Sequence, residues 1–129
     1  MNITLEMARS ATAAVVEETG ADYKYLDHHD LCLYNTSLDE GDNIHDDAYG
    51  CIVGEALKRL GAHVVESVNG EGIYSVIESD GVRDADGNIV TVESAAGRYF
   101  NAAQWAQDGG RTHGAALGEA ESYTKIWLK

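Results

Sequence analysis

Apolar residues recur at helical spacing at the start of the chain. One face of this segment carries Ile3, Met7, Ala11, Ala14 and Val15. Thr4 stands where an N-cap residue belongs, and Glu6 lies in the first turn, where the helix dipole favours an anion. Gly20 follows at the position of a left-handed C-cap. The pattern predicts an amphipathic helix over residues 4–19.

A second helix is predicted just before Gly61, which would end it. Its apolar positions share one face and are Tyr49, Val53, Ala56, Leu57 and Leu60. Asp46 or Asp47 is expected to cap or complement the N-terminus of this helix. The helix is therefore expected to follow directly on an acidic segment.

The clearest helical stripe lies in the last third of the chain. Its members are Ala95, Tyr99, Ala102, Ala103 and Ala106. Thr91 is the predicted N-cap of this helix, and Glu93 is expected to complement its first turn. Gly109-Gly110 should stop it, and Thr112 should cap a final helix. Trp105 flanks the stripe, and an anchor in the core is favoured over the alternative, a recognition hot spot.

Strand-like patterns are shorter. Residues 23–25 and 31–34 are aromatic and apolar with a polar stretch between them, which is typical of a β-hairpin. Residues 62–90 fit both helical and extended patterns, so their structure stays open. Together the patterns predict an α+β, mostly α fold. It would have four to five helices around one core, a short β-hairpin, and a single domain spanning residues 1–129.

The composition is strongly acidic, with 22 Asp and Glu against 9 Lys and Arg and a formal net charge of −13. Such a charge repels polyanions, so direct binding to nucleic acid or to an anionic membrane is not expected, whereas a basic protein partner is favoured. Carboxylates are dense in the loop 35–48, which has no Lys or Arg. The predicted binding residues are Asp39, Glu40, Asp42, Asp46 and Asp47.

Other features of the sequence favour a cytoplasmic protein. No apolar run approaches the ~20 residues that cross a bilayer. The N-terminal segment lacks the basic and apolar regions of a secretory signal. Two cysteines, Cys32 and Cys51, are too few for a disulfide framework. No cofactor is predicted, and the alanine-rich third helix leaves a homodimer open.

Two metal sites can be read from the spacing of ligand types, although neither is favoured. Finger-like spacing relates His29, Cys32, His45 and Cys51, but the paired-cysteine knuckle of zinc sites is missing, and buried thiols explain the cysteines better. Five positions of an EF-hand calcium loop are matched by Asp84, Asp86, Gly87, Ile89 and Glu93. The first position of that loop would be Val82, which cannot ligate. The sequence also has no nucleophile elbow and no phosphate-binding loop, so enzyme activity is not predicted.

Two motifs resemble those of small uncharacterised proteins of actinobacteria and their phages. Residues 51–61 match the helix pattern C-(I/L)-V-G-x-x-L-x-x-L-G, which follows a hairpin in that group. Residues 103–110 match a later helix, A-Q-x-x-Q-D-x-G, and residues 114–117 match G-x-A-L. The resemblance covers roughly 23–61 and 91–121. It implies a phage-type accessory protein that acts in the host cytoplasm.

The expected function is non-enzymatic binding to a basic host protein, with the acidic segment, residues 37–48, as the contact surface. In its sharpest form the carboxylates would mimic nucleic-acid phosphates. The alternatives are a structural zinc protein that uses the His/Cys set, or a small-ligand-binding protein or small hydrolase with a polar pocket.

Overall fold

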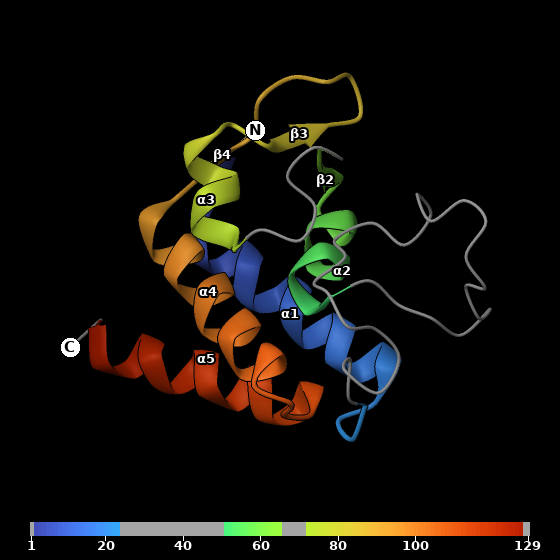
Figure 1. Cartoon of the computed structure of the whole chain (residues 1–129), viewed down its shortest axis with the longest axis vertical. Helices are drawn as coiled ribbons and strands as arrows, with labels where there is room; N and C mark the ends of the chain where they lie inside the picture. The colour runs from blue at the N-terminus through green and yellow to red at the C-terminus, as the bar shows by residue number, and fades with distance from the viewer. Residues whose placement is uncertain (1, 24–50, 66–71, 128–129) are drawn as a thin grey trace.

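The computed structural model describes residues 2–23, 51–65 and 72–127 (Figure 1). Over these residues the protein is an α+β, mostly helical fold, as predicted, with five helices and two short two-stranded sheets. In chain order the elements are β1 (Asn2–Ile3), α1 (Leu5–Thr19), α2 (Ile52–Arg59), β2 (Ala62–Val64), α3 (Ile73–Glu78), β3 (Val82–Asp84), β4 (Thr91–Val92), α4 (Ser94–Asp108) and α5 (His113–Trp127).

Helix α4 is the centre of the fold. It packs against α1, α2, α3 and α5, and Figure 1 shows it between α3 and α5. Its Tyr99 and Phe100 side chains are fully buried, as are Val15 of α1 and Leu57 of α2. Burial of each such side chain contributes about 1.5–3 kcal/mol. The core therefore forms between helices, and the sheets lie at its edge.

Helix α1 begins and ends where the sequence predicts. The Thr4 hydroxyl accepts a hydrogen bond from the Met7 N–H at 3.3 Å, and Glu6 lies in the first turn. Gly20 ends the helix with φ of 98°, in the left-handed region that glycine adopts at low cost. The local caps were therefore sufficient to define this helix.

Thr91 is a strand residue, so its predicted role as the N-cap of α4 is wrong. Strand β4 pairs in parallel with β1, with Asn2 opposite Thr91, and the Thr91 hydroxyl donates to the Asn2 side chain at 2.9 Å. The N-cap residue of α4 is Glu93, whose carboxylate makes no cap bond to its own helix. It accepts instead from the Leu5 N–H at 3.3 Å, at the start of α1.

The N-cap of α2 is Cys51, so the prediction of an aspartate cap is wrong. The Cys51 thiol is fully buried and its Sγ accepts from the Gly54 N–H at 3.4 Å. The residues predicted for this role, Asp46 and Asp47, lie outside the described part of the chain. Gly61 ends the helical turn with φ of 79°, as predicted.

The ambiguous segment 62–90 contains both kinds of structure. Strands β2 and β3 pair antiparallel, with His63 opposite Arg83, and α3 lies between them in the chain. The hairpin predicted at residues 23–34 falls outside the described residues except for Tyr23. No helix in the described ranges has the length and apolarity needed to cross a membrane.

Helix α5 begins at the predicted cap and continues to Trp127. The Thr112 hydroxyl accepts from the Ala115 N–H at 3.1 Å. The free N–H groups of His113 and Gly114 donate to the carbonyls of Tyr23 and Ala21, at 2.8 and 2.9 Å. The segment after α1 therefore docks directly against the start of α5.

Candidate functional site

Helix α4 leaves one edge exposed, and Trp105 lies on it. The side chain of Trp105 is 64% exposed, so its interpretation as a core anchor is wrong. Arg98, Asn101 and Trp105 follow one another at spacings of three and four residues and therefore share a helix face. The opposite face of α4 carries the buried aromatic residues of the core.

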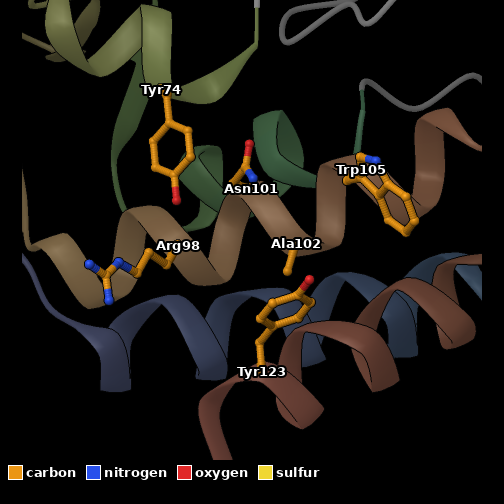
Figure 2. A pocket seen from close by; sticks show the side chains of 6 residues that line it. All are labelled: Tyr74, Arg98, Asn101, Ala102, Trp105 and Tyr123. Atoms are coloured by element: carbon orange, nitrogen blue, oxygen red, sulfur yellow. The ribbon is translucent and has the colours of Figure 1, made fainter. Parts of the chain in front are cut away.

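A groove runs along this exposed edge. Near Trp105 it forms a hollow of about 190 Å³ lined by Tyr74, Arg98, Asn101, Ala102, Trp105 and Tyr123 (Figure 2). A second hollow of about 370 Å³ is lined by Tyr74, Ile77, Val92, Glu93, Ser94, Gly97 and Arg98. The two hollows are adjacent, since both are lined by Tyr74 and Arg98, and together they are named the aromatic groove. Figure 2 shows Tyr74 on one side of α4 and Tyr123 on the other.

Tyr74 is positioned by the docking of α3 on α4. The buried Gln104 side chain accepts from the Ile73 N–H at 2.8 Å and so caps the first turn of α3. A Cβ atom at Gly97 would lie 3.4 Å from Ile77 Cδ1. Helix α3 therefore lies directly against α4 at position 97, and Tyr74 lines the groove.

A second glutamine, Gln107, caps the first turn of α2 in the same way. The fully buried Gln107 accepts from the Ile52 N–H at 2.6 Å, at the first residue of α2. Its amide nitrogen donates to Asp108 at 3.1 Å. The two glutamines of the A-Q-x-x-Q-D-x-G motif thus cap two different helices. Two glutamines three residues apart in an alanine-rich helix indicate that both side chains lie on the same face of the helix. The sequence does not indicate which backbone groups they bind.

A partly buried polar network positions α5, which carries Tyr123. The Tyr99 hydroxyl donates to Glu121 at 2.7 Å, and Arg9 of α1 binds both oxygens of the same carboxylate at 2.8 and 3.0 Å. Burial and the hydrogen bond to Glu121 raise the pKa of Tyr99, so it remains a neutral donor. This arrangement ties α1, α4 and α5 together.

His113 is the buried titratable group at the start of α5. Its ring packs edge-on against Tyr23, with 4.8 Å between centroids, and Nδ1 lies 2.9 Å from the Thr19 hydroxyl. Because that hydroxyl donates to the Val15 carbonyl, it accepts from Nδ1–H, and Nε2 keeps a lone pair. No described residue hydrogen-bonds Nε2. Burial lowers the pKa of His113 to about 4, so the ring is neutral near pH 7.

The residues predicted to bind a partner or a zinc ion lie mostly outside the described residues. This holds for the binding residues Asp39, Glu40, Asp42, Asp46 and Asp47 and for three of the zinc set, His29, Cys32 and His45. The fourth, Cys51, is buried at the start of α2. Within the described ranges no three His, Cys, Asp or Glu side chains are grouped so as to hold a metal ion.

The segment that matched a calcium loop forms a turn after β3. The Asp84 carboxylate accepts from the backbone N–H groups of Asp86 and Asn88, both at 2.9 Å. These bonds, the one from Asn88 foremost, lower the pKa of Asp84. Glu93, which would complete the loop, interacts with the N-terminus of α1 instead. Two carboxylates of the predicted loop, those of Asp84 and Glu93, therefore bind backbone N–H groups.

Known proteins give no guide to this arrangement, because no family model, curated protein or solved structure matches the chain.

Proposed function

We propose that this protein acts by non-enzymatic binding, using its acidic segment to recognise a basic protein partner. The observation that supports this is the distribution of charge. Residues 35–48 hold five carboxylates and no Lys or Arg, in a chain whose net charge is −13. A field of this sign accelerates encounter with a cationic surface and repels nucleic acid and anionic lipid.

The cations of the described residues do not offset this excess. Four of them are already engaged with carboxylates of the same fold, in the pairs Arg9–Glu121, Lys58–Glu55, Arg59–Glu18 and Arg111–Glu119. A cation held by a neighbouring carboxylate contributes little to the field elsewhere on the surface, because the pair is nearly neutral at a distance. These four cations therefore do little to balance the carboxylates of residues 35–48.

The resemblance to small proteins of actinobacteria and their phages supports a partner in the cytoplasm of such a host. A DNA-binding protein of the host is the sharpest version of the proposal, because closely spaced carboxylates reproduce the charge of consecutive phosphates. In that version the protein competes with nucleic acid for a basic surface.

Charge-matched variants test the proposal. In the segment variant, Asp39, Glu40, Asp42, Asp46 and Asp47 are replaced by Asn or Gln. In the control variant the same change is made at five exposed carboxylates elsewhere, Glu17, Asp22, Glu78, Asp80 and Asp86. Each variant has five fewer negative charges, so a diffuse effect of net charge would be equal in both.

The measurement is capture of partners from an actinobacterial lysate over a series of salt concentrations, followed by competition with duplex DNA. We expect the control variant to retain a partner that elutes as salt rises, and the segment variant to lose it. Equal loss in both variants, or retention in both, would contradict recognition by the acidic segment. Failure of DNA to compete would refute the mimicry version alone.

A further inference from the structure

A histidine nitrogen at the start of α5 is buried without a described partner. The His113 side chain is fully buried, and its Nδ1–H donates to the Thr19 hydroxyl. No described residue hydrogen-bonds Nε2, so this atom is left as a buried acceptor. A proton taken from solvent at Nε2 would make it a buried, charged donor without an acceptor, which is costly. The surroundings of His113 therefore favour the neutral ring.

The position of His113 in its helix adds a second cost to protonation. His113 is the first residue of α5, and a cation is disfavoured at a helix N-terminus, where the free N–H groups carry positive partial charge. A charged ring would thus be opposed by the helix as well as by burial.

No described carboxylate offsets these costs. The titratable side chains near this end of the fold, on α1, the segment after it, α4 and α5, are Glu17, Glu18, Asp22, Tyr23, Asp108 and Arg111. The charged members of this set are exposed to solvent, and Arg111 is also paired with Glu119. Among the described residues, burial alone lowers the pKa of His113, to about 4.

His113 and its neighbour Gly114 hold the segment after α1 against α5. Their N–H groups donate to the carbonyls of Tyr23 and Ala21, at 2.8 and 2.9 Å. The His113 ring packs edge-on against Tyr23, and a Cβ atom at position 114 would lie 2.9 Å from Ala21. These contacts between residues 20–23 and the first turn of α5 are here named the histidine latch. They pass through two adjacent residues of α5, so a displacement of the His113 ring disturbs them together.

The rest of α5 is held to the fold by other contacts. Arg9 of α1 binds Glu121, more than two turns further along α5, at 2.8 and 3.0 Å. Between these positions Ala116 and Ala120 are fully buried in the core. The first turn of α5 can therefore move while the remainder of the helix stays packed.

Glycine joints lie on both sides of the latch. Gly20, after α1, has φ of 98°, and Gly110, before α5, has φ of 88°. A Cβ atom at either position would meet nothing within 4 Å. Glycine changes its backbone conformation at low cost, and hinges often use such residues. The two strips of chain that form the latch can thus separate by rotation at these joints.

We propose that the histidine latch is released by acid, because protonation of His113 at Nε2 frees residues 20–23 from the first turn of α5 while the helical core stays folded. The chain continues from Tyr23 into the stretch that contains the acidic segment, so the latch fixes the point at which this stretch leaves the described fold. The proposal does not depend on the identity of a binding partner.

The size of the effect follows from the two states of the ring. A released ring lies in water, where the pKa of histidine is near 6.5, whereas the latched ring has a pKa of about 4. The open latch therefore binds the proton more tightly, and acid favours it. Between pH 7 and pH 5 the ratio of open to closed latch should rise about twentyfold.

The test follows hydrogen exchange of backbone amides by NMR, in the full chain at pH 7 and pH 5. Protection of the His113 and Gly114 amides, relative to an unstructured chain at the same pH, should fall about twentyfold. At both pH values these amides should exchange faster than the Phe100 amide of the core. Low urea concentrations should accelerate them much less than Phe100, since local opening exposes little surface. The ring nitrogen shifts of His113 report its protonation directly.

Two histidine variants make the test specific. His113→Asn removes the titrating group and keeps an amide that can donate to Thr19, so the twentyfold fall should disappear. His63→Asn is the matched control, because His63 is exposed on β2 and lies outside the latch, and it should retain the fall. Circular dichroism verifies that each variant folds. If His113→Asn does not fold, the ring titration of the wild type decides, with an expected midpoint below pH 6.5 that tracks the change in protection.

Three results would overturn the proposal. An unchanged fall in His113→Asn would assign the pH dependence to another group. Exchange of the His113 and Gly114 amides at the rate and urea dependence of Phe100 would mean that only global unfolding exposes them. A His113 ring that titrates near pH 6.5 without any change in protection would show that the latch does not confine it.

Discussion

Replacing Gly114 by alanine is expected to destabilise the protein, whereas the same replacement at Gly118, one turn later in α5, is expected to stabilise it. A Cβ atom at position 114 would lie 2.9 Å from both the Cβ and the carbonyl oxygen of Ala21. Neither distance is compatible with a real contact, and the carbonyl is backbone. At position 118 nothing lies within 4 Å, and the residue is exposed.

The magnitudes follow from two opposing effects. Alanine in place of glycine inside a helix gains about 1 kcal/mol of helix propensity, and Gly118→Ala should realise most of it. At position 114 the overpacking penalty is about 1–3 kcal/mol. The displacement also strains the hydrogen bond from the Gly114 N–H to the Ala21 carbonyl, which is 2.9 Å long. We therefore expect Gly114→Ala to lose up to about 2 kcal/mol from these two effects, and more where the hydrogen bond weakens.

Urea unfolding followed by circular dichroism measures both variants, and thermal unfolding should place their midpoints on opposite sides of the wild type. Adding Ala21→Gly to the Gly114→Ala variant should restore only part of the loss, because the carbonyl oxygen of residue 21 remains in place. If both single variants stabilise the protein equally, the close approach of α5 to the segment after α1 does not constrain the fold, and the reasoning fails.

Two further predictions concern buried polar groups. Gln107→Leu should cost about 1–3 kcal/mol, since it leaves the buried Ile52 N–H without its acceptor; an unchanged urea midpoint would show that the cap contributes nothing. His113 should make stability fall as the solution becomes acidic, because burial holds its pKa at about 4 in the folded protein while the unfolded chain binds the proton near pH 6.5. Its contribution is complete above pH 6.5 and about 3 kcal/mol is lost on going down to pH 4. His113→Asn should be less sensitive to pH over this interval than the wild type, and an equally steep profile would exclude His113 as the cause.

Elements with local start and stop signals could be predicted from the sequence. Thr4 and Gly20 bound α1, and Thr112 starts α5, because a side chain or a left-handed glycine acts within a few residues of its own helix. The mostly helical α+β class follows from the same signals. The acidic binding residues remain a prediction, since they lie outside the described residues.

Elements fixed by distant partners could not be predicted. Strand β1 is only two residues long and exists by pairing with β4, almost ninety residues later in the chain. Glu93 was read as a first-turn acid of its own helix, yet its carboxylate serves the start of α1. Sequence periodicity describes the environment of a residue relative to its neighbours in the chain, so a cap supplied by another element leaves no periodic trace.

The exposure of Trp105 follows from the same kind of long-range capping. Gln104 and Gln107 must both point into the fold to reach α3 and α2. At 3.6 residues per turn, position 105 is rotated by about 100° from position 104 and about 160° from position 107. Once the two glutamines face inward, the indole has to face outward, whatever its hydrophobicity. The groove on α4 is thus a direct consequence of the buried amides, and a change that releases either glutamine should alter the groove as well as the helix that it caps.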